Sequence, residues 1–295
     1  MGDRIGRGVS VWLAAVVLAG VSSMTAPAHD VSAQGLAGAS NADSRPVTVP
    51  FDPSRWTLEW ADEFDGGPAP DPRNWSYETG YVRNKEEQYY TNDRRENARV
   101  ENGRLVIEAR RDGFEGHKTT SASLHTSGKR PLLYGRIEVR AKIPTGRGAW
   151  PAIWTLGENR RDVGWPRCGE IDIMENVGFA PGTVHANVHT GTYNHTRGTG
   201  KGNRIDARQP WDAFHTYAVE WWPDRMEFFF DDTRYFVFRK EADEDGVWPF
   251  DKPQYLILNL AIGGAWGGQK GVDDGIFPLR YEIEYVRYFK AVPPK

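Results

Sequence analysis

Hydrophobic and polar residues alternate along most of the chain after residue 50. Between Arg136 and Ile143, charged side chains occupy one face and apolar side chains the other, with a period of two throughout. No apolar pattern of helical period runs for three turns. Many short strands with no helices between them predict an all-β sandwich of two antiparallel sheets. Similar runs predict further strands over residues 105–109, 217–222, 226–230, 235–238, 255–262 and 281–289.

The first 50 residues follow a different pattern. Arg4 and Arg7 precede an apolar run over residues 9–21, and small residues follow it. This order predicts a secretory signal peptide over residues 1–28, with an alternative cleavage site after residue 33; the other interpretation is an uncleaved membrane anchor. Residues 29–50 are rich in Ala, Ser, Gly and Pro, which predicts a disordered linker. We therefore expect one folded domain over residues 51–295, located outside the cytoplasm.

The composition excludes several classes of function. The formal charge of the 295-residue chain is only -3, so it has no broad basic field that would hold nucleic acid or an anionic membrane. Cys168 is the single cysteine, which excludes an internal disulfide and a multi-cysteine zinc site. Aromatic residues make up 13% of the chain and include 12 Trp, an unusual number whose use the composition alone does not explain.

Three carboxylates are concentrated in the short run EIDIME. In a regular strand Glu170 and Asp172 share a face, but Glu175 points to the opposite face because it is an odd number of residues away. A β-bulge with one extra residue, Ile173 or Met174, brings all three to one face, and such bulges are common beside active sites. We therefore expect a bulged strand with three carboxylates on one side.

The bulge also determines the distance between the two glutamates. Their backbones are separated by roughly 13 Å at about 3.3 Å per residue, and side chains that lean together leave a gap of about 5 Å. That gap suits a retaining glycosidase, in which one carboxylate attacks the sugar and the other protonates the leaving oxygen. The run could instead be an exposed edge strand or a calcium site. The nearby Trp150, Trp154 and Trp165 argue against a solvated edge.

Two motifs resemble the signature of glycoside hydrolase family 16, namely GAWPAIWTL at residues 148–156 and WPRCGEIDIME at residues 165–175. The E-x-D-x-x-E spacing is similar to that of the laminarinase-type members. The resemblance covers most of residues 55–289 and includes further motifs at residues 84–91, 184–190 and 259–267. It implies a β-jelly roll with a substrate cleft across one concave sheet. Residues 51–295 would then form the catalytic domain.

The same resemblance implies a role for each carboxylate. By position, Glu170 matches the nucleophile, Asp172 the assisting acid and Glu175 the general acid/base. The implied activity is that of a secreted retaining endo-β-glucanase acting on 1,3-β or mixed 1,3-1,4-β glucans such as laminarin. Agarase-like or carrageenase-like galactan hydrolysis and a non-catalytic β-glucan-binding protein are the alternatives. The presence of all three carboxylates favours an enzyme.

The tryptophans acquire a candidate role from this resemblance. Sugar rings have apolar faces, which flat aromatic side chains cover. We expect Trp165 and Trp266 to be sugar platforms. Trp150 and Trp154 are equally compatible with substrate contact and with core packing.

Polar residues on the strand after the carboxylates supply further candidates. His185, Asn187 and His189 share one face of that strand, and we expect His189 to contact either the sugar or the acid/base glutamate. A structural histidine is the alternative. A zinc site that uses both histidines with Asp172 is disfavoured, since strand spacing separates the imidazoles by about 13 Å. Asn84 is a candidate donor to a sugar hydroxyl.

Catalysis by carboxylates requires no cofactor, and we expect a monomer whose partner is a polysaccharide. The resemblance also implies a structural calcium ion on the convex side, held by the Gly103 carbonyl and an acid near the C-terminal strand. Glu284 occupies that position, where the family more often has Asp.

Overall fold

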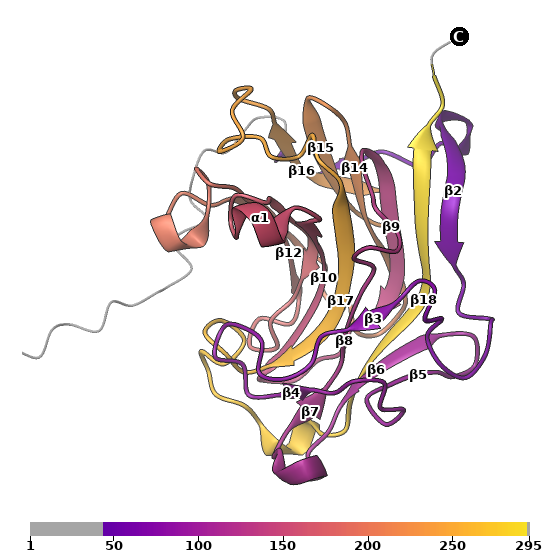
Figure 1. Cartoon of the computed structure of the whole chain (residues 1–295), viewed down its shortest axis with the longest axis vertical. Coiled ribbons are helices and arrows are strands. Elements are labelled where there is room, and N and C mark those ends of the chain that lie inside the picture. Colours follow the sequence, from indigo (N-terminus) through magenta and orange to yellow (C-terminus); the bar gives the residue numbers. More distant parts are fainter. Residues whose placement is uncertain (1–43, 294–295) are drawn as a thin grey trace, which may run out of the picture. The chain divides into compact units, whose positions relative to one another are not determined.

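Two antiparallel sheets form most of the computed structural model, which describes residues 44–293 (Figure 1). The larger sheet has nine strands, of which β2 (Trp56–Asp62) pairs with β18 outside the main order. The main order is β1 (Val47–Thr48), β16 (Thr233–Arg239), β15 (Arg225–Phe230), β14 (His215–Trp221), β9 (Gly135–Lys142), β18 (Leu279–Ala291), β6 (Leu105–Ala109) and β5 (Ala98–Val100).

The second sheet has seven strands and contains the acidic strand β11. Its order is β13 (Lys201–Asp206), β12 (Thr183–His189), β11 (Glu170–Glu175), β10 (Ala149–Gly157), β17 (Gln254–Ile262), β8 (Ser123–His125) and β3 (Ser76–Tyr77). The strands β4 (Tyr89–Tyr90) and β7 (Thr120–Ser121) form a short parallel pair. Within residues 44–293, α1 (Arg160–Val163) is the one α-helix, and the 3-10 helices are Pro53–Arg55, Phe114–Gly116, His195–Arg197 and Asp274–Ile276.

The hydrophobic core lies between the two sheets. Alternate residues of β17, from Leu256 to Ile262, are buried there together with Ile137 and Val139 of β9. The intervening residues of β17 face away from the core, and Asn259 is the polar one among them. The seven strands predicted from alternation begin and end within two residues of their predicted positions. The predicted fold class, a jelly-roll sandwich of two antiparallel sheets, is confirmed.

The predicted disordered linker over residues 29–50 is wrong for residues 44–50. Val47 and Thr48 form β1 against β16, and the Val49 amide donates to the Asp232 carbonyl at 2.7 Å. The Ser44 hydroxyl also accepts a hydrogen bond from the Val237 amide at 3.2 Å. None of the side chains in this segment is buried, but backbone hydrogen bonds to the outer strand of a sheet hold it without a core of its own.

The remaining N-terminal predictions lie outside the described residues. These are the signal peptide over residues 1–28 and the linker over residues 29–43. Among residues 44–293, the structure contains no helix with the length and apolar character that crossing a membrane requires.

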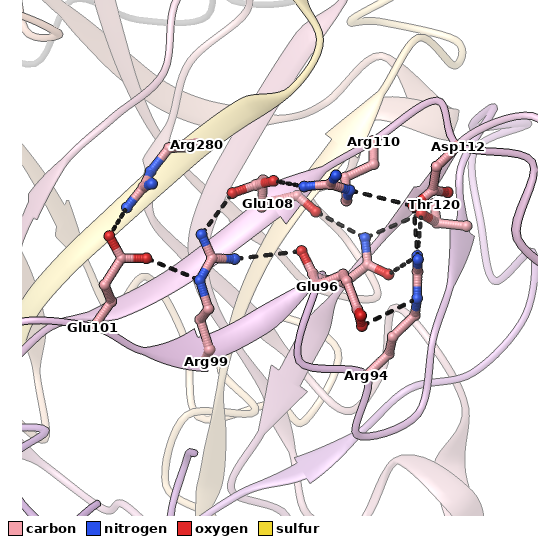
Figure 2. Close-up of polar contacts among 10 residues, drawn as sticks. Arg94, Glu96, Arg99, Glu101, Glu108, Arg110, Asp112, Thr120 and Arg280 are labelled. Atoms are coloured by element: carbon pink, nitrogen blue, oxygen red, sulfur yellow. Dashed lines mark hydrogen bonds and ion pairs between the residues drawn. The ribbon is translucent and has the colours of Figure 1, made fainter. Parts of the chain in front are cut away.

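Charged side chains link the strands β5, β6 and β18 of the larger sheet (Figure 2). Arg99 contacts Glu108 at 2.7 Å and Glu101 at 2.9 Å. Arg280 on β18 contacts the other oxygen of Glu101 at 3.0 Å, and Arg110 pairs with the other oxygen of Glu108. Because Glu108 is buried, the guanidinium groups of Arg99 and Arg110 compensate for the loss of water around its carboxylate.

Candidate active site

The acidic strand β11 contains the predicted bulge. On the neighbouring strand β10, the adjacent residues Trp154 and Ile153 pair with Asp172 and Met174. Ile173 therefore has no partner on β10. Ile173 and Met174 both point into the core, although they are consecutive in sequence. Glu170, Asp172 and Glu175 therefore lie together on the outer face of the seven-stranded sheet. The extra residue is Ile173, one of the two that the sequence allowed.

The pairing of β11 with β12 gives the distance along the strand between Glu170 and Glu175. Glu170 lies opposite His189, and Glu175 lies opposite His185. These histidines are four residues apart, so the two glutamate backbones are separated by roughly 13 Å along the strand. This separation agrees with the value expected from a bulged strand.

Each glutamate accepts a hydrogen bond from a tryptophan ring nitrogen. Trp165 Nε1 donates to Glu170 Oε2 at 2.7 Å, and Trp150 Nε1 donates to Glu175 Oε1 at 3.0 Å. The second oxygen of Glu175 accepts from Asn187 Nδ2 at 3.2 Å. The two carboxylates are therefore held in fixed orientations by donors from three different segments of the chain.

Asp172 lies between the glutamates on β11 and His189 lies opposite Glu170 on β12, and both side chains are almost fully buried. His189 Nε2 is 3.2 Å from Asp172 Oδ2 and 3.6 Å from Glu170 Oε1. Burial acts to lower the pKa of His189, but Glu170 and Asp172 outweigh burial and raise it to about 9. His189 is therefore a cation at neutral pH and compensates for the negative charge beside it.

The pKa values of both glutamates are raised, mainly by burial. For Glu170, the neighbouring His189 cation and the Trp165 donor oppose this effect and favour the ionised form. For Glu175, the negative charge of Asp172 adds to burial and raises the pKa further. Burial and the charge of Glu170 also raise the pKa of Asp172. The pKa of Glu175 is raised to about 8, which favours its protonated form at neutral pH, while His189 and Trp165 act to keep Glu170 ionised.

The structure places all four candidate tryptophans on the outer face of the seven-stranded sheet, but in two different environments. Trp150 is only 9% exposed and packs edge-on against Trp266, while Trp154 is 7% exposed and lies under the Arg83 guanidinium at 4.9 Å. Little of either ring is exposed to a sugar, so the main contribution of each is the hydrogen bond that its N–H donates, to Glu175 from Trp150 and to Asn259 from Trp154. Trp165 and Trp266 are only partly buried, and their role as sugar platforms stays a prediction.

His189 lies beside the carboxylates, but its ion pairs go to Glu170 and Asp172 rather than to the expected acid/base Glu175. Its contact with a sugar stays a prediction. Asn84 lies in a turn with a left-handed backbone, φ 54°, and its amide donates to Glu86 Oε1 at 3.1 Å. The Asn84 carbonyl accepts from the Ala265 amide at 2.8 Å, which fixes this turn beside the Trp266 segment. Its predicted role as a donor to sugar also remains a prediction.

A buried polar chain behind Trp154 was not predicted. Trp154 Nε1 donates to Asn259 Oδ1 at 2.7 Å, and Asn259 Nδ2 donates to the Tyr90 hydroxyl at 3.0 Å. The Tyr90 hydroxyl in turn donates to Glu86 Oε2 at 3.4 Å. The sequence contained one signal for it, since Asn259 is the only polar residue between Leu256 and Ile262.

The contacts of Glu284 do not match the calcium site expected there together with Gly103. Glu284 on β18 is ion-paired with Arg140, and the nearby Glu282 lies 3.8 Å from Arg104. Calcium requires six to eight oxygen ligands, whereas the groups that face these two carboxylates are cations. The residues as placed do not fit a calcium ion.

Two glutamates held on one face of a sheet are the pair of groups that glycoside hydrolases use. The family model for glycosyl hydrolases family 16 matches residues 85–287. The chain belongs to this family. It is 49% identical over 247 residues to a β-glucanase of Rhodothermus marinus, covering 80% of this chain and 86% of that protein.

Solved structures of relatives share the fold over most of their length. The laminarinase from Rhodothermus marinus has a TM-score of 0.78 and 48% identity, covering 81% of this chain and 98% of that one. SCLam, a non-specific endo-β-1,3(4)-glucanase of the same family, has a TM-score of 0.79 and 45% identity, covering 84% of this chain and 97% of that one. A mutant of SCLam was co-crystallized with 1,3-β-D-cellotriosyl-glucose.

Proposed function

We propose that this protein is a retaining endo-β-glucanase that hydrolyses 1,3-β and mixed 1,3-1,4-β glucans such as laminarin. One observation carries the proposal. The bulge in β11 turns Glu170 and Glu175 to the same face, and each accepts a hydrogen bond from a different tryptophan. Its similarity to a β-glucanase and to laminarinases supports the same substrate class. Secretion and a monomeric state remain predictions from the sequence.

In the first step Glu170 attacks the anomeric carbon while Glu175 donates its proton to the glycosidic oxygen. The bond from C1 to that oxygen breaks, a bond from C1 to a Glu170 oxygen forms, and the shortened chain leaves as an alcohol. In the second step Glu175, now ionised, takes a proton from water, and the resulting hydroxide displaces Glu170 from C1. Two displacements return the β-anomer.

His189 and Asp172 adjust the charge around the nucleophile. In the resting site the His189 cation lies between the Asp172 and Glu170 carboxylates, and it stabilises the ionised form of Glu170. When Glu170 becomes an ester its charge is lost, which removes one of the causes that raise the pKa of Asp172. Charge can therefore be shared among Glu170, Asp172 and His189 without contact with bulk water.

The stereochemical course of the reaction tests the proposal. Proton NMR during early hydrolysis of a laminari-oligosaccharide should show the β-anomer first, because a glycosyl-enzyme is formed and then opened. A parallel assay for new reducing ends on laminarin, lichenan, agarose, carrageenan and xyloglucan should give the highest rates on the first two. First appearance of the α-anomer, or a preference for agarose, would contradict the proposal.

Replacing Trp165 with phenylalanine should move the acidic limb of the pH profile for kcat/KM to higher pH. The Trp165 N–H lowers the pKa of Glu170, so its removal raises that pKa, and Glu170 then ionises only at higher pH. Phenylalanine keeps an aromatic ring at this position, although a smaller one, and lacks the N–H donor. The profile of the variant on laminarin measures the shift. An unchanged acidic limb would show that Trp165 does not act on the nucleophile.

Replacing Trp150 with phenylalanine should instead move the basic limb to higher pH. The Trp150 N–H lowers the pKa of Glu175, so without this donor Glu175 keeps its proton at higher pH and remains a competent acid there. The same profile on laminarin reports the result, and the Trp165 variant serves as its matched control. If both variants moved the same limb, the separate roles of the two glutamates would be wrong.

A further inference from the structure

The side chain of Asn187 connects Glu175 with the outermost strand of the seven-stranded sheet, β13. Asn187 on β12 lies opposite Asp172 on β11 and opposite Gly202 on β13, so these three residues form a row across three strands. Asn187 is almost fully buried, and its Nδ2 atom donates to Glu175 Oε2 at 3.2 Å. The orientation of this amide therefore decides whether Glu175 keeps its second donor beside Trp150.

Gly202 leaves the space that the Asn187 amide occupies. Its φ lies outside the left-handed region, so backbone conformation does not require glycine at this position in β13. A β-carbon there would overlap Asn187 Oδ1 and would lie 2.9 Å from Asn187 Cγ, whereas carbon atoms that are not bonded pack at about 3.5–4.0 Å. It would also lie 2.6 Å from the Ala186 carbonyl oxygen. Glycine in the interior of a strand often marks such a close approach.

We propose that Gly202 is a positioning residue for the general acid, because its missing side chain gives the Asn187 amide the space from which it donates to Glu175. The assignment rests on the proposed function, which gives Glu175 the part of the acid. Gly202 acts only through Asn187, whose Oδ1 lies over the glycine while its Nδ2 reaches the carboxyl group. A strand at the edge of the sheet thus controls a hydrogen bond at the reacting groups.

The basic limb of the pH profile then depends on the residue at position 202. Burial and the charge of Asp172 raise the pKa of Glu175, and the hydrogen bond from Asn187 lowers it. Loss of that bond therefore raises the pKa, and Glu175 keeps its proton to higher pH. The titratable and charged groups around Glu175 are not altered by a change at Gly202. They are Glu170 and Asp172 on β11, His185 and His189 on β12, and Arg204 on β13 opposite His185.

The first test replaces Gly202 with alanine and follows kcat/KM on laminarin against pH. We expect the basic limb to move to higher pH by about one unit, since the ionised carboxylate loses a hydrogen bond, and the acidic limb to stay in place. Gly200→Ala is the matched control, because a β-carbon at Gly200 would have no atom within 4 Å, and its profile should equal that of the wild type. An unmoved basic limb in Gly202→Ala, or an equal shift in the control, would overturn the proposal.

A second pair of variants separates the effect on Asn187 from general strain. Asn187→Ala lacks the donor, so its basic limb should move as far as that of Gly202→Ala. Adding Gly202→Ala to Asn187→Ala should move the limb no further, because the atoms that the new β-carbon displaces are gone. A further shift in the double variant would overturn the proposal. If Gly202→Ala alone failed to fold, the double variant should still fold, and failure of both would give Gly202 a purely structural role.

The pKa of Glu175 can also be measured without turnover. NMR titration of protein labelled with ¹³C at the glutamate carboxyl carbons, with Glu175→Gln to assign the signal, should give a higher pKa in Gly202→Ala than in the wild type. The same pKa in both proteins would overturn the proposal. If the wild type failed to hydrolyse laminarin, the proposed function would fail, while the titration would still decide whether Gly202 acts on Glu175.

Discussion

Replacing Glu170 with glutamine should lower the turnover of laminarin by about four orders of magnitude or more. Glutamine keeps the shape of the side chain but cannot attack the anomeric carbon, and loss of a nucleophile has effects of this size. The Trp165 N–H can still donate to the amide oxygen, so the local structure has no reason to collapse. Release of reducing ends from laminarin measures the loss.

Folding and binding must be followed with the same variant. Its melting temperature and its affinity for a laminari-oligosaccharide should remain close to those of the wild type. Glu115→Gln is a suitable control, because Glu115 is an exposed carboxylate on the 3-10 helix Phe114–Gly116. Near-normal hydrolysis by Glu170→Gln would remove Glu170 from the mechanism, and a large fall in melting temperature would give it a structural role.

Replacing Glu175 with alanine should have an effect that depends on the leaving group. General acid catalysis contributes about 10²–10⁴-fold, so hydrolysis of laminarin should fall by that range. An aryl β-glycoside of a laminari-oligosaccharide has a leaving group that needs no proton, so formation of its glycosyl-enzyme should be much less affected. Stopped-flow release of the phenol measures this first step.

The second step of this variant provides an independent readout. Without Glu175 no base activates water, so the glycosyl-enzyme should accumulate, and added azide should release it as a β-glycosyl azide. The basic limb of the pH profile should also disappear, since Glu175 is the group whose raised pKa produces it. Equal losses on laminarin and on the aryl substrate, with no product from azide, would assign Glu175 to structure rather than to proton transfer.

The sequence predicted the sandwich and the acidic strand because both depend on local periodicity. A period of two identifies which residues face the core, and the failure of that period at Glu175 indicates a bulge. The register of β10 then showed that Ile173 is the extra residue. The choice between Ile173 and Met174 depends on pairing with a neighbouring strand, which a single strand's pattern does not contain.

The hydrogen-bond partners of the carboxylates were beyond such a prediction. The sequence left Trp150 and Trp154 open between substrate contact and core packing, and it gave no sign that their N–H groups donate to Glu175 and Asn259. The polar chain from Asn259 to Glu86 joins segments more than 160 residues apart, as the separation of 169 between Asn259 and Tyr90 shows. Periodicity contains no information on contacts between such distant segments, so these roles follow only from the fold.

The pairing of Val47 and Thr48 with β16 has a consequence for the behaviour of the protein in solution. Without this segment β16 would be the outermost strand of the nine-stranded sheet, with a row of unpaired backbone N–H and C=O groups. Such a row is a template onto which a strand of another molecule can add, and this is a common route to aggregation. Residues 44–49 cover part of that row, and Asn203 Nδ2 donates to the Tyr235 carbonyl of β16 at 2.7 Å. A short segment that contributes little to the core thus covers a sheet edge to which a strand of another molecule could otherwise add.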